Sequence, residues 1–134
     1  MSASSESLYM LLFHGNDWDR QLSREQTQQR LERAMVWFDS VHQRGIVRGT
    51  HALARSGASI SREKGECVLD GPYAESKEIL GGYLLIQADS LEDAMAVARQ
   101  YPMLDLGIEI EVRPVLTECP IATRLREQSA LVTA

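Results

Sequence analysis

DGPYAESKEILGGYLLIQA occupies positions 70–88 and contains the stretch that predicts most about the fold. Its second half, Gly82–Ala88, is strongly apolar, which is typical of a central strand covered on both faces. Its first half opens with Asp-Gly-Pro, which favours a turn because Gly71 tolerates unusual backbone angles and Pro72 fixes φ. We therefore expect a turn that leads into a central strand.

Two further strands frame this one. Ser7–His14 reads SLYMLLFH, is apolar at nearly every position and predicts a second central strand. Ile108–Val115 reads IEIEVRPV and alternates strictly between apolar and charged residues, so one of its faces should be polar. Pro114 cannot donate a hydrogen bond to a neighbour, which places this strand at an edge of the sheet.

Two helices are predicted from apolar residues at helical spacing. The first follows a capping-box pattern at Ser23–Gln26 and should end before Gly45, so we expect it at Arg24–Arg44. The second starts after Ser90 and ends before Pro102. The expected core-facing stripes are Leu31, Ala34, Met35, Phe38 and Val41 in the first helix, and Leu91, Ala94, Met95 and Ala98 in the second.

The order of these elements predicts the fold class. A weaker strand is expected at Ile46–Leu53 and an added hairpin at Ser59–Leu69, with its turn at Lys64-Gly65. The core order is then strand-helix-strand, hairpin, strand-helix-strand, which is the split βαβ pattern of a ferredoxin-like α+β sheet with two helices on one face. Residues 1–7 are expected to be disordered, and the tail at 117–134 to contain a short helix near 121–128.

Composition limits the partners. The 134-residue chain has 44% hydrophobic and 25% charged residues, as a soluble single domain does, and its net charge of −5 argues against nucleic acid. The sequence offers no signal peptide and no membrane-spanning run, so we expect a cytoplasmic protein. Cys67 and Cys119 lack a paired metal spacing, and no nucleotide or dinucleotide fingerprint occurs, so we expect neither a metal nor a cofactor.

The predicted sheet leaves one face without helices. That face should carry apolar side chains together with charged ones, and an exposed apolar surface of this width is unusual for a monomer. We therefore expect a homodimer that stacks two such faces and encloses a lined cavity. The side chains expected there include Tyr83, Leu85, Gln87, Glu109, Glu111 and Arg113.

The charged middle of the 70–78 segment permits two readings. Asp70 can fix the turn by accepting backbone hydrogen bonds, or it can act as a base or ligand contact. Glu75 and Glu78 share a face on a helical turn, where like charges raise a carboxyl pKa, or they are simply solvated. Lys77 and Tyr73 can bind a polar ligand at the rim of the cavity. The sequence leaves both readings open.

Histidines and tryptophans are the remaining candidates. His14 ends a strand close to Asp17, so it is either a proton carrier or a solvated strand end. His51 is a second candidate of the same kind. Trp18 and Trp37 can form the floor of a pocket, although aromatic residues beside apolar stripes are usually core.

DGPYAESKEILGGYLLI resembles the DGPF-type members of the YCII-related family, whose usual string is DGPFAETKE followed by a glycine pair and a strand. The resemblance covers residues 8–116, with Tyr73 and Ser76 as mild departures. It implies a dimeric α/β-barrel built from ferredoxin-like protomers. It also suggests regulation, because genes of this type often neighbour sigma-factor genes.

The resemblance leaves two functions open. Relatives in the wider group carry a helix-one histidine and an aspartate before a proline, proposed as an acid–base pair, whereas this sequence has Ala34 and Tyr101 near those positions. This difference favours a small-molecule-binding domain with a regulatory role. The alternative is an acid–base lyase or isomerase for a compact organic acid or phenol, with His14, Asp70, Glu75 and Glu78 as candidate proton carriers.

Overall fold

Four strands form one antiparallel sheet in the order β2-β5-β1-β6. Their bounds are β1 Leu8–His14, β2 Val47–Ala52, β5 Leu80–Gln87 and β6 Glu109–Pro114. The two most apolar strands, β1 and β5, lie in the centre and β6 lies at an edge, as the sequence predicts. The computed structural model describes residues 7–15, 18–62, 65–69 and 80–133.

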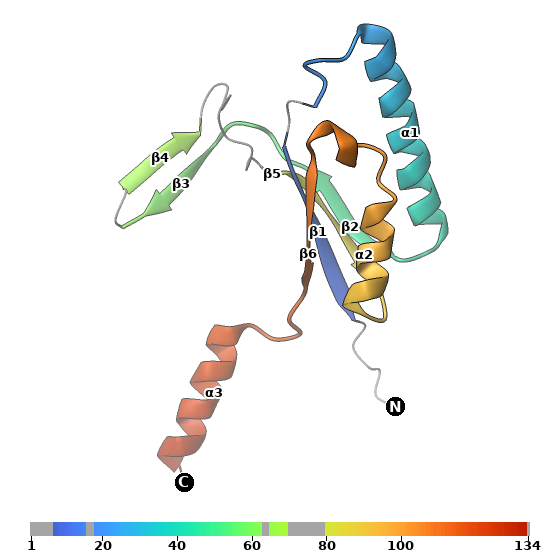
Figure 1. Cartoon of the computed structure of the whole chain (residues 1–134). Coiled ribbons are helices and arrows are strands. Elements are labelled where there is room, and N and C mark those ends of the chain that lie inside the picture. The colour runs from blue at the N-terminus through green and yellow to red at the C-terminus, as the bar shows by residue number, and fades with distance from the viewer. Residues whose placement is uncertain (1–6, 16–17, 63–64, 70–79, 134) are drawn as a thin grey trace.

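Helices α1 (Arg24–Gln43) and α2 (Leu91–Arg99) lie on the same side of the sheet (Figure 1). A short 3-10 turn, η1 (Leu104–Leu106), connects α2 to β6. The element order and the sheet order together make this an α+β domain with a ferredoxin-like topology. The predicted fold class of the protomer is therefore confirmed.

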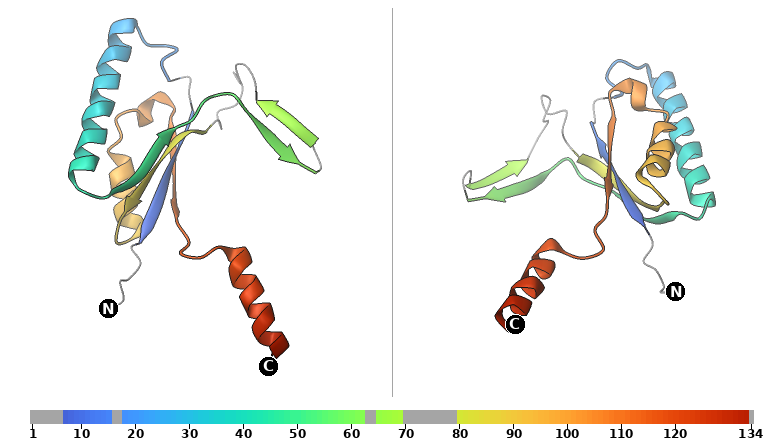
Figure 2. Two further views of the ribbon diagram at one scale, coloured as in Figure 1. Left: turned by 180° about the vertical axis from the view of Figure 1, so that it is seen from behind. Right: turned by 60° about the horizontal axis from the view of Figure 1, so that its bottom comes forward.

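Two elements stand apart from this two-layer body. β3 (Gly57–Ser61) and β4 (Gly65–Leu69) form a separate antiparallel hairpin, and α3 spans Pro120–Thr133. Both views of Figure 2 show the hairpin and α3 projecting on the side of the sheet away from α1 and α2. The sequence predicted the hairpin correctly. It predicted a last helix near 121–128, which is shorter than the observed α3.

Local signals account for the helix ends. The Ser23 hydroxyl accepts a hydrogen bond from the Gln26 backbone N–H at 3.0 Å, and the Gln26 side chain accepts one from the Ser23 N–H at 2.9 Å. This reciprocal pair satisfies two of the donors that a helix N-terminus leaves free. Gly45 follows the C-cap with φ of 74°, a left-handed angle that glycine adopts without strain.

The core lies between the helices and the sheet. Leu11 of β1 and Leu84 and Ile86 of β5 have no exposed surface. Burying a side chain of this size stabilises the fold by about 1.5–3 kcal/mol. The other buried members of this cluster are Trp37, Val41, Ala88, Ala94, Val97 and Ala98.

The predicted helix stripes were partly wrong. Leu31 and Met35 of α1 are 44% and 60% exposed, whereas Trp37 is 5% exposed. The helix is rotated so that Trp37 and Val41 meet the sheet, while Leu31 and Met35 do not. This rotation is favoured because the large Trp37 ring buries more apolar area. In α2, likewise, Leu91 is 43% exposed and Val97 is buried.

A bidentate ion pair ties α1 to η1. The Arg30 guanidinium donates to both carboxylate oxygens of Asp105, at 2.7 and 2.9 Å, and to the Pro102 carbonyl oxygen at 3.0 Å. The hydrogen bond from Arg30 lowers the pKa of the Asp105 carboxyl below its ordinary value. The segment after α2 is therefore fixed against the first half of α1.

Candidate functional site

Alternate residues of the central sheet face away from α1 and α2. Leu84 and Ile86 are fully buried under the helices, and Ile110 and Val112 of β6 pack against the same core. Because side chains alternate along a strand, their neighbours point to the opposite side. We call that side the open face; its described members include Met10, Leu12, His14, His51, Tyr83, Leu85, Gln87, Glu109, Glu111 and Arg113.

Three charged or titratable side chains of the open face contact one another. The His14 Nε2 atom lies 3.0 Å from Glu111 Oε1, and Arg113 Nη1 lies 3.6 Å from Glu111 Oε2. The Glu111 carboxylate therefore stands between a histidine and a guanidinium. Such a carboxylate can orient the imidazole through this contact.

A second polar pair lies toward the other edge of the open face, on β5 and β2. The Tyr83 hydroxyl is 2.7 Å from His51 Nδ1, and the two residues are cross-strand partners on β5 and β2. One row across the sheet runs His51, Tyr83, Leu12 and Glu111. Apolar Leu12 therefore separates the two polar pairs.

The structure brings together part of the predicted site. His14, Glu111 and Arg113 form one cluster, and Glu109 lies opposite His14 in the register of β1 and β6. Tyr83 pairs with His51 instead, which the sequence offered only as a separate candidate. The remaining predicted residues, Asp70, Tyr73, Glu75, Lys77 and Glu78, lie outside the described residues, as does Asp17.

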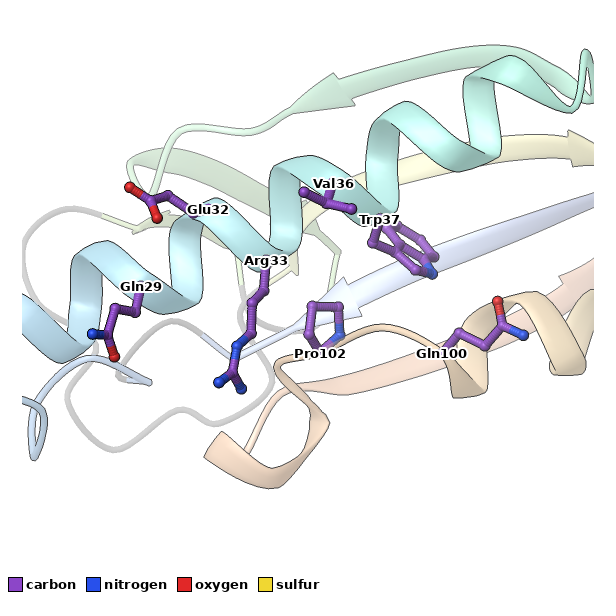
Figure 3. Close-up of a pocket in the computed structure, with 7 residues that line it drawn as sticks. All are labelled: Gln29, Glu32, Arg33, Val36, Trp37, Gln100 and Pro102. Carbon is purple, nitrogen blue, oxygen red and sulfur yellow. The ribbon is translucent and has the colours of Figure 1, made fainter.

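A groove of about 710 Å³ runs between α1 and the segment after α2. Figure 3 shows Arg33 extending from α1 toward the chain beyond Pro102, while Glu32 points away from it. Its lining combines polar side chains with Val36, Trp37 and Pro102. It lies on the outer side of α1 and shares no residue with the open face.

A second cavity, of about 340 Å³, lies where β1 ends and β5 begins. Gly82 and its cross-strand partner Ala52 are small and sit on the helix-covered side. A Cβ atom at Gly82 would come within 2.8 Å of the His51 carbonyl oxygen. Gly82 of the glycine pair therefore serves the close approach of β5 to β2, and its missing side chain leaves space above the sheet.

Aromatic side chains dominate the walls of this cavity, and the sequence did not bring them together. Phe13 and Tyr101 have ring centroids 5.2 Å apart, and Phe38 lies 6.2 Å from each of them. Trp18 also lines the cavity. The only sequence signal for this cavity was the glycine pair, since Gly82 lies opposite the small Ala52. The rings come from three segments that are distant in the sequence.

The two positions of the acid–base pair proposed for the wider YCII group are apolar or aromatic in this chain. Ala34 is buried with Met103 and Ile108, and Tyr101 packs against the same cluster. Burial raises the pKa of the Tyr101 hydroxyl above its ordinary value, so it stays protonated at neutral pH. Neither residue can act as the base of such a pair near neutral pH.

Cys119 is exposed at the start of α3. Hydrogen bonds from the backbone N–H groups of Ala122 and then Ile121 lower the pKa of its thiol. The effect comes from backbone N–H groups at the start of a helix and not from a basic neighbour, so no sequence motif marks it. Within the described ranges, no three His, Cys, Asp or Glu side chains gather as a metal site would require, and no helix has the length and apolar character to cross a membrane.

A ferredoxin-like α+β domain with a partly polar open face defines the structural class of this protein. The model of the YCII-related domain family matches residues 8–118, and the chain therefore belongs to that family. The match ends before α3 begins at Pro120. A search of curated proteins found no match to this chain.

Proposed function

We propose that this YCII-related domain is a cytoplasmic homodimer that binds a small organic ligand and serves a regulatory role. The observation that carries the proposal is the composition of the open face. It combines partly exposed Met10, Leu12 and Leu85 with the cluster of His14, Glu111 and Arg113. An apolar surface with a few convergent polar groups is the usual composition of a ligand site.

The surface that the helices leave uncovered supports the proposed homodimer. α1 and α2 cover one side of the sheet, while the hairpin and α3 project on the other side without lying along it (Figure 2). Stacking two open faces about a two-fold axis would remove Met10, Leu12 and Leu85 from water. The polar edge carried by β6 would then line the space between the protomers.

We place the ligand between the 70–78 segment and this polar edge. Arg113 and Lys77 would hold an anionic group, while the carboxylates of Glu109 and Glu111 would reject polyanions. The residues proposed to contact the ligand are Asp70, Tyr73, Lys77, Tyr83, Glu109, Glu111 and Arg113. A compact organic acid or a phenol fits this set of groups.

The second candidate is an acid–base lyase or isomerase for the same class of compound. The 3.0 Å contact between His14 and Glu111 favours it, because an oriented imidazole can move a proton. Ala34 and Tyr101, at the positions of the group's proposed catalytic pair, favour binding without turnover. Binding is therefore the first candidate and catalysis the second.

A thermal-shift screen of small organic acids and phenols tests the binding proposal. A compound that raises the melting temperature should bind Arg113→Gln about tenfold more weakly, because a charge-assisted hydrogen bond is lost. Arg99→Gln removes an exposed arginine of α2 on the opposite side of the sheet and is the matched control. Equal affinity of the Arg113 variant and the parent would contradict this placement of the ligand.

Turnover separates the two candidates. Each compound that binds is incubated with the protein and followed by proton NMR for exchange or product. No change over hours supports the binding function. Product formation that is lost in His14→Gln would establish the enzyme instead.

A further inference from the structure

We propose that the 340 Å³ cavity between the helices and the end of the sheet is a second binding site, which takes a compact aromatic carboxylate. This site goes beyond the proposed function, because Phe13, Phe38 and Tyr101 line it from the helix-covered side of the sheet, while His51 and Tyr83 close it at the ends of β2 and β5. The proposed open-face ligand contacts Arg113 and Glu111 on the other side, and Tyr83 is a residue that the two sites share. Three features of the cavity identify its ligand: its rings, its space and its charge.

The rings form a surface suited to another ring. Phe13, Phe38 and Tyr101 pack against the core, yet each keeps part of its surface exposed, whereas Leu11 and Leu84 beside them keep none. Phe13 and Tyr101 meet edge-to-face at 72°. A planar ligand that enters the cavity can continue this edge-to-face packing, which aliphatic groups cannot do.

The space suits one compact ring. Gly82 and Ala52 are cross-strand partners and place at most one methyl group on the cavity floor. A volume of about 340 Å³ is near the lower end of the range for small-molecule sites, which begins at about 300 Å³. Large polycyclic ligands are therefore excluded by size.

The charge identifies an anion. Arg55 lines the cavity, and no carboxylate side chain does so among the described residues. Arg55 is exposed, so its guanidinium stands at the mouth, where it can form a bidentate pair with a carboxylate. The net charge of the chain is −5, so this local excess of positive charge is not a general property of its surface.

Quenching of tryptophan fluorescence by benzoate tests the proposal, because Trp18 lines the cavity and the only other tryptophan, Trp37, does not. Benzoate should quench the full-length protein saturably. Cyclohexanecarboxylate keeps the charge but lacks the aromatic ring, and it should bind at least about tenfold more weakly. In Trp18→Phe the benzoate quenching should disappear while the benzoate-induced rise in melting temperature persists.

Variants assign the binding to this cavity. Arg55→Gln should weaken benzoate binding by about tenfold. Arg62→Gln, another exposed arginine outside the cavity, and Arg113→Gln on the open face should leave it unchanged. Three outcomes would each overturn the proposal: no saturable benzoate binding, equal binding of cyclohexanecarboxylate, or a loss in Arg113→Gln that Arg55→Gln does not show. The open-face proposal stands or falls separately on Arg113.

Discussion

At Gly82, strand β5 passes so close to β2 that a side chain has no room between them. A Cβ atom there would lie 2.8 Å from the His51 carbonyl oxygen and 3.2 Å from the Ala52 Cα atom. Backbone atoms within a sheet cannot move aside cheaply. We therefore expect Gly82→Ala to lower the free energy of unfolding by about 1–3 kcal/mol, as overpacking does, measured by urea denaturation.

Gly49 provides a matched control for this prediction, because it lies in β2 of the same sheet and a Cβ atom there would meet nothing within 4 Å. Gly49→Ala should be neutral or stabilise the protein by up to about 1 kcal/mol, since it restricts the unfolded chain. Equal destabilisation by both substitutions would show that strand glycines matter here for a reason other than the close approach.

A second prediction at the residue scale concerns Asp105, whose carboxyl pKa is lowered by the hydrogen bond from Arg30. A depressed native pKa means that folding favours the carboxylate form. The stability it contributes is present above the unfolded-state pKa, about 3.9, and is lost as the pH falls through the native value. Asp105→Asn should therefore be less stable than the parent at pH 7, with a difference that shrinks below about pH 4 in thermal melts.

Removing the partner provides the control. In an Arg30→Gln background the carboxylate no longer receives the bidentate hydrogen bonds, so Asp105→Asn should change the stability little at any pH. A pH-dependent difference that persists in this background would assign the effect to another group.

At the scale of elements, α3 is the one helix that contributes no residue to either described core cluster. It projects from the body in every view (Figures 1 and 2), and its Ile121 and Leu125 are 70% and 60% exposed. Isolated helices of about this length are only marginally stable in water, so α3 adds little to the stability of the fold by itself. We expect removal of residues 116–134 to leave the melting temperature of the remaining domain unchanged.

Calorimetry of the truncated chain measures this effect. Trp37→Ala is the positive control, because Trp37 is buried between α1, α2 and the sheet and its loss should cost about 3–5 kcal/mol. A fall of several degrees on truncation would mean that α3 stabilises the body after all.

For the whole molecule, the main prediction is the assembly. Stacked open faces should bury about 1,200–2,000 Å² in total if the dimer is specific. Light scattering with gel filtration should then give a particle of twice 15.0 kDa. Leu85→Glu places a charge in the middle of the open face and should produce the monomer, because an unpaired buried charge is strongly unfavourable.

Met35 gives the control for this substitution. It is apolar and 60% exposed, but it lies on α1, away from the open face. Met35→Glu should leave the dimer intact. A parent protein that elutes as a 15.0 kDa particle at micromolar concentration, or a dimer lost through Met35→Glu and kept in Leu85→Glu, would refute assembly through the sheet.

The sequence by itself determined the element order, the two central strands and the edge position of β6. These follow from local chemistry: apolar runs, strict alternation in Ile108–Val115, the capping box at Ser23 and the helix break before Pro102. The order of elements then leaves few topologies open, so the ferredoxin-like sheet could be predicted. The same alternation correctly put Glu111 and Arg113 on one face.

Only the tertiary structure decided which side chains meet. Glu111 reaches His14 across 97 positions, and Tyr83 reaches His51 across 32, because strand register sets these contacts and no local pattern encodes register between distant strands. The rotation of α1, which buries Trp37 and exposes Met35, is likewise a competition between packing alternatives on one helix. The aromatic cavity exists because three segments converge above Gly82, and that convergence is a property of the folded sheet alone.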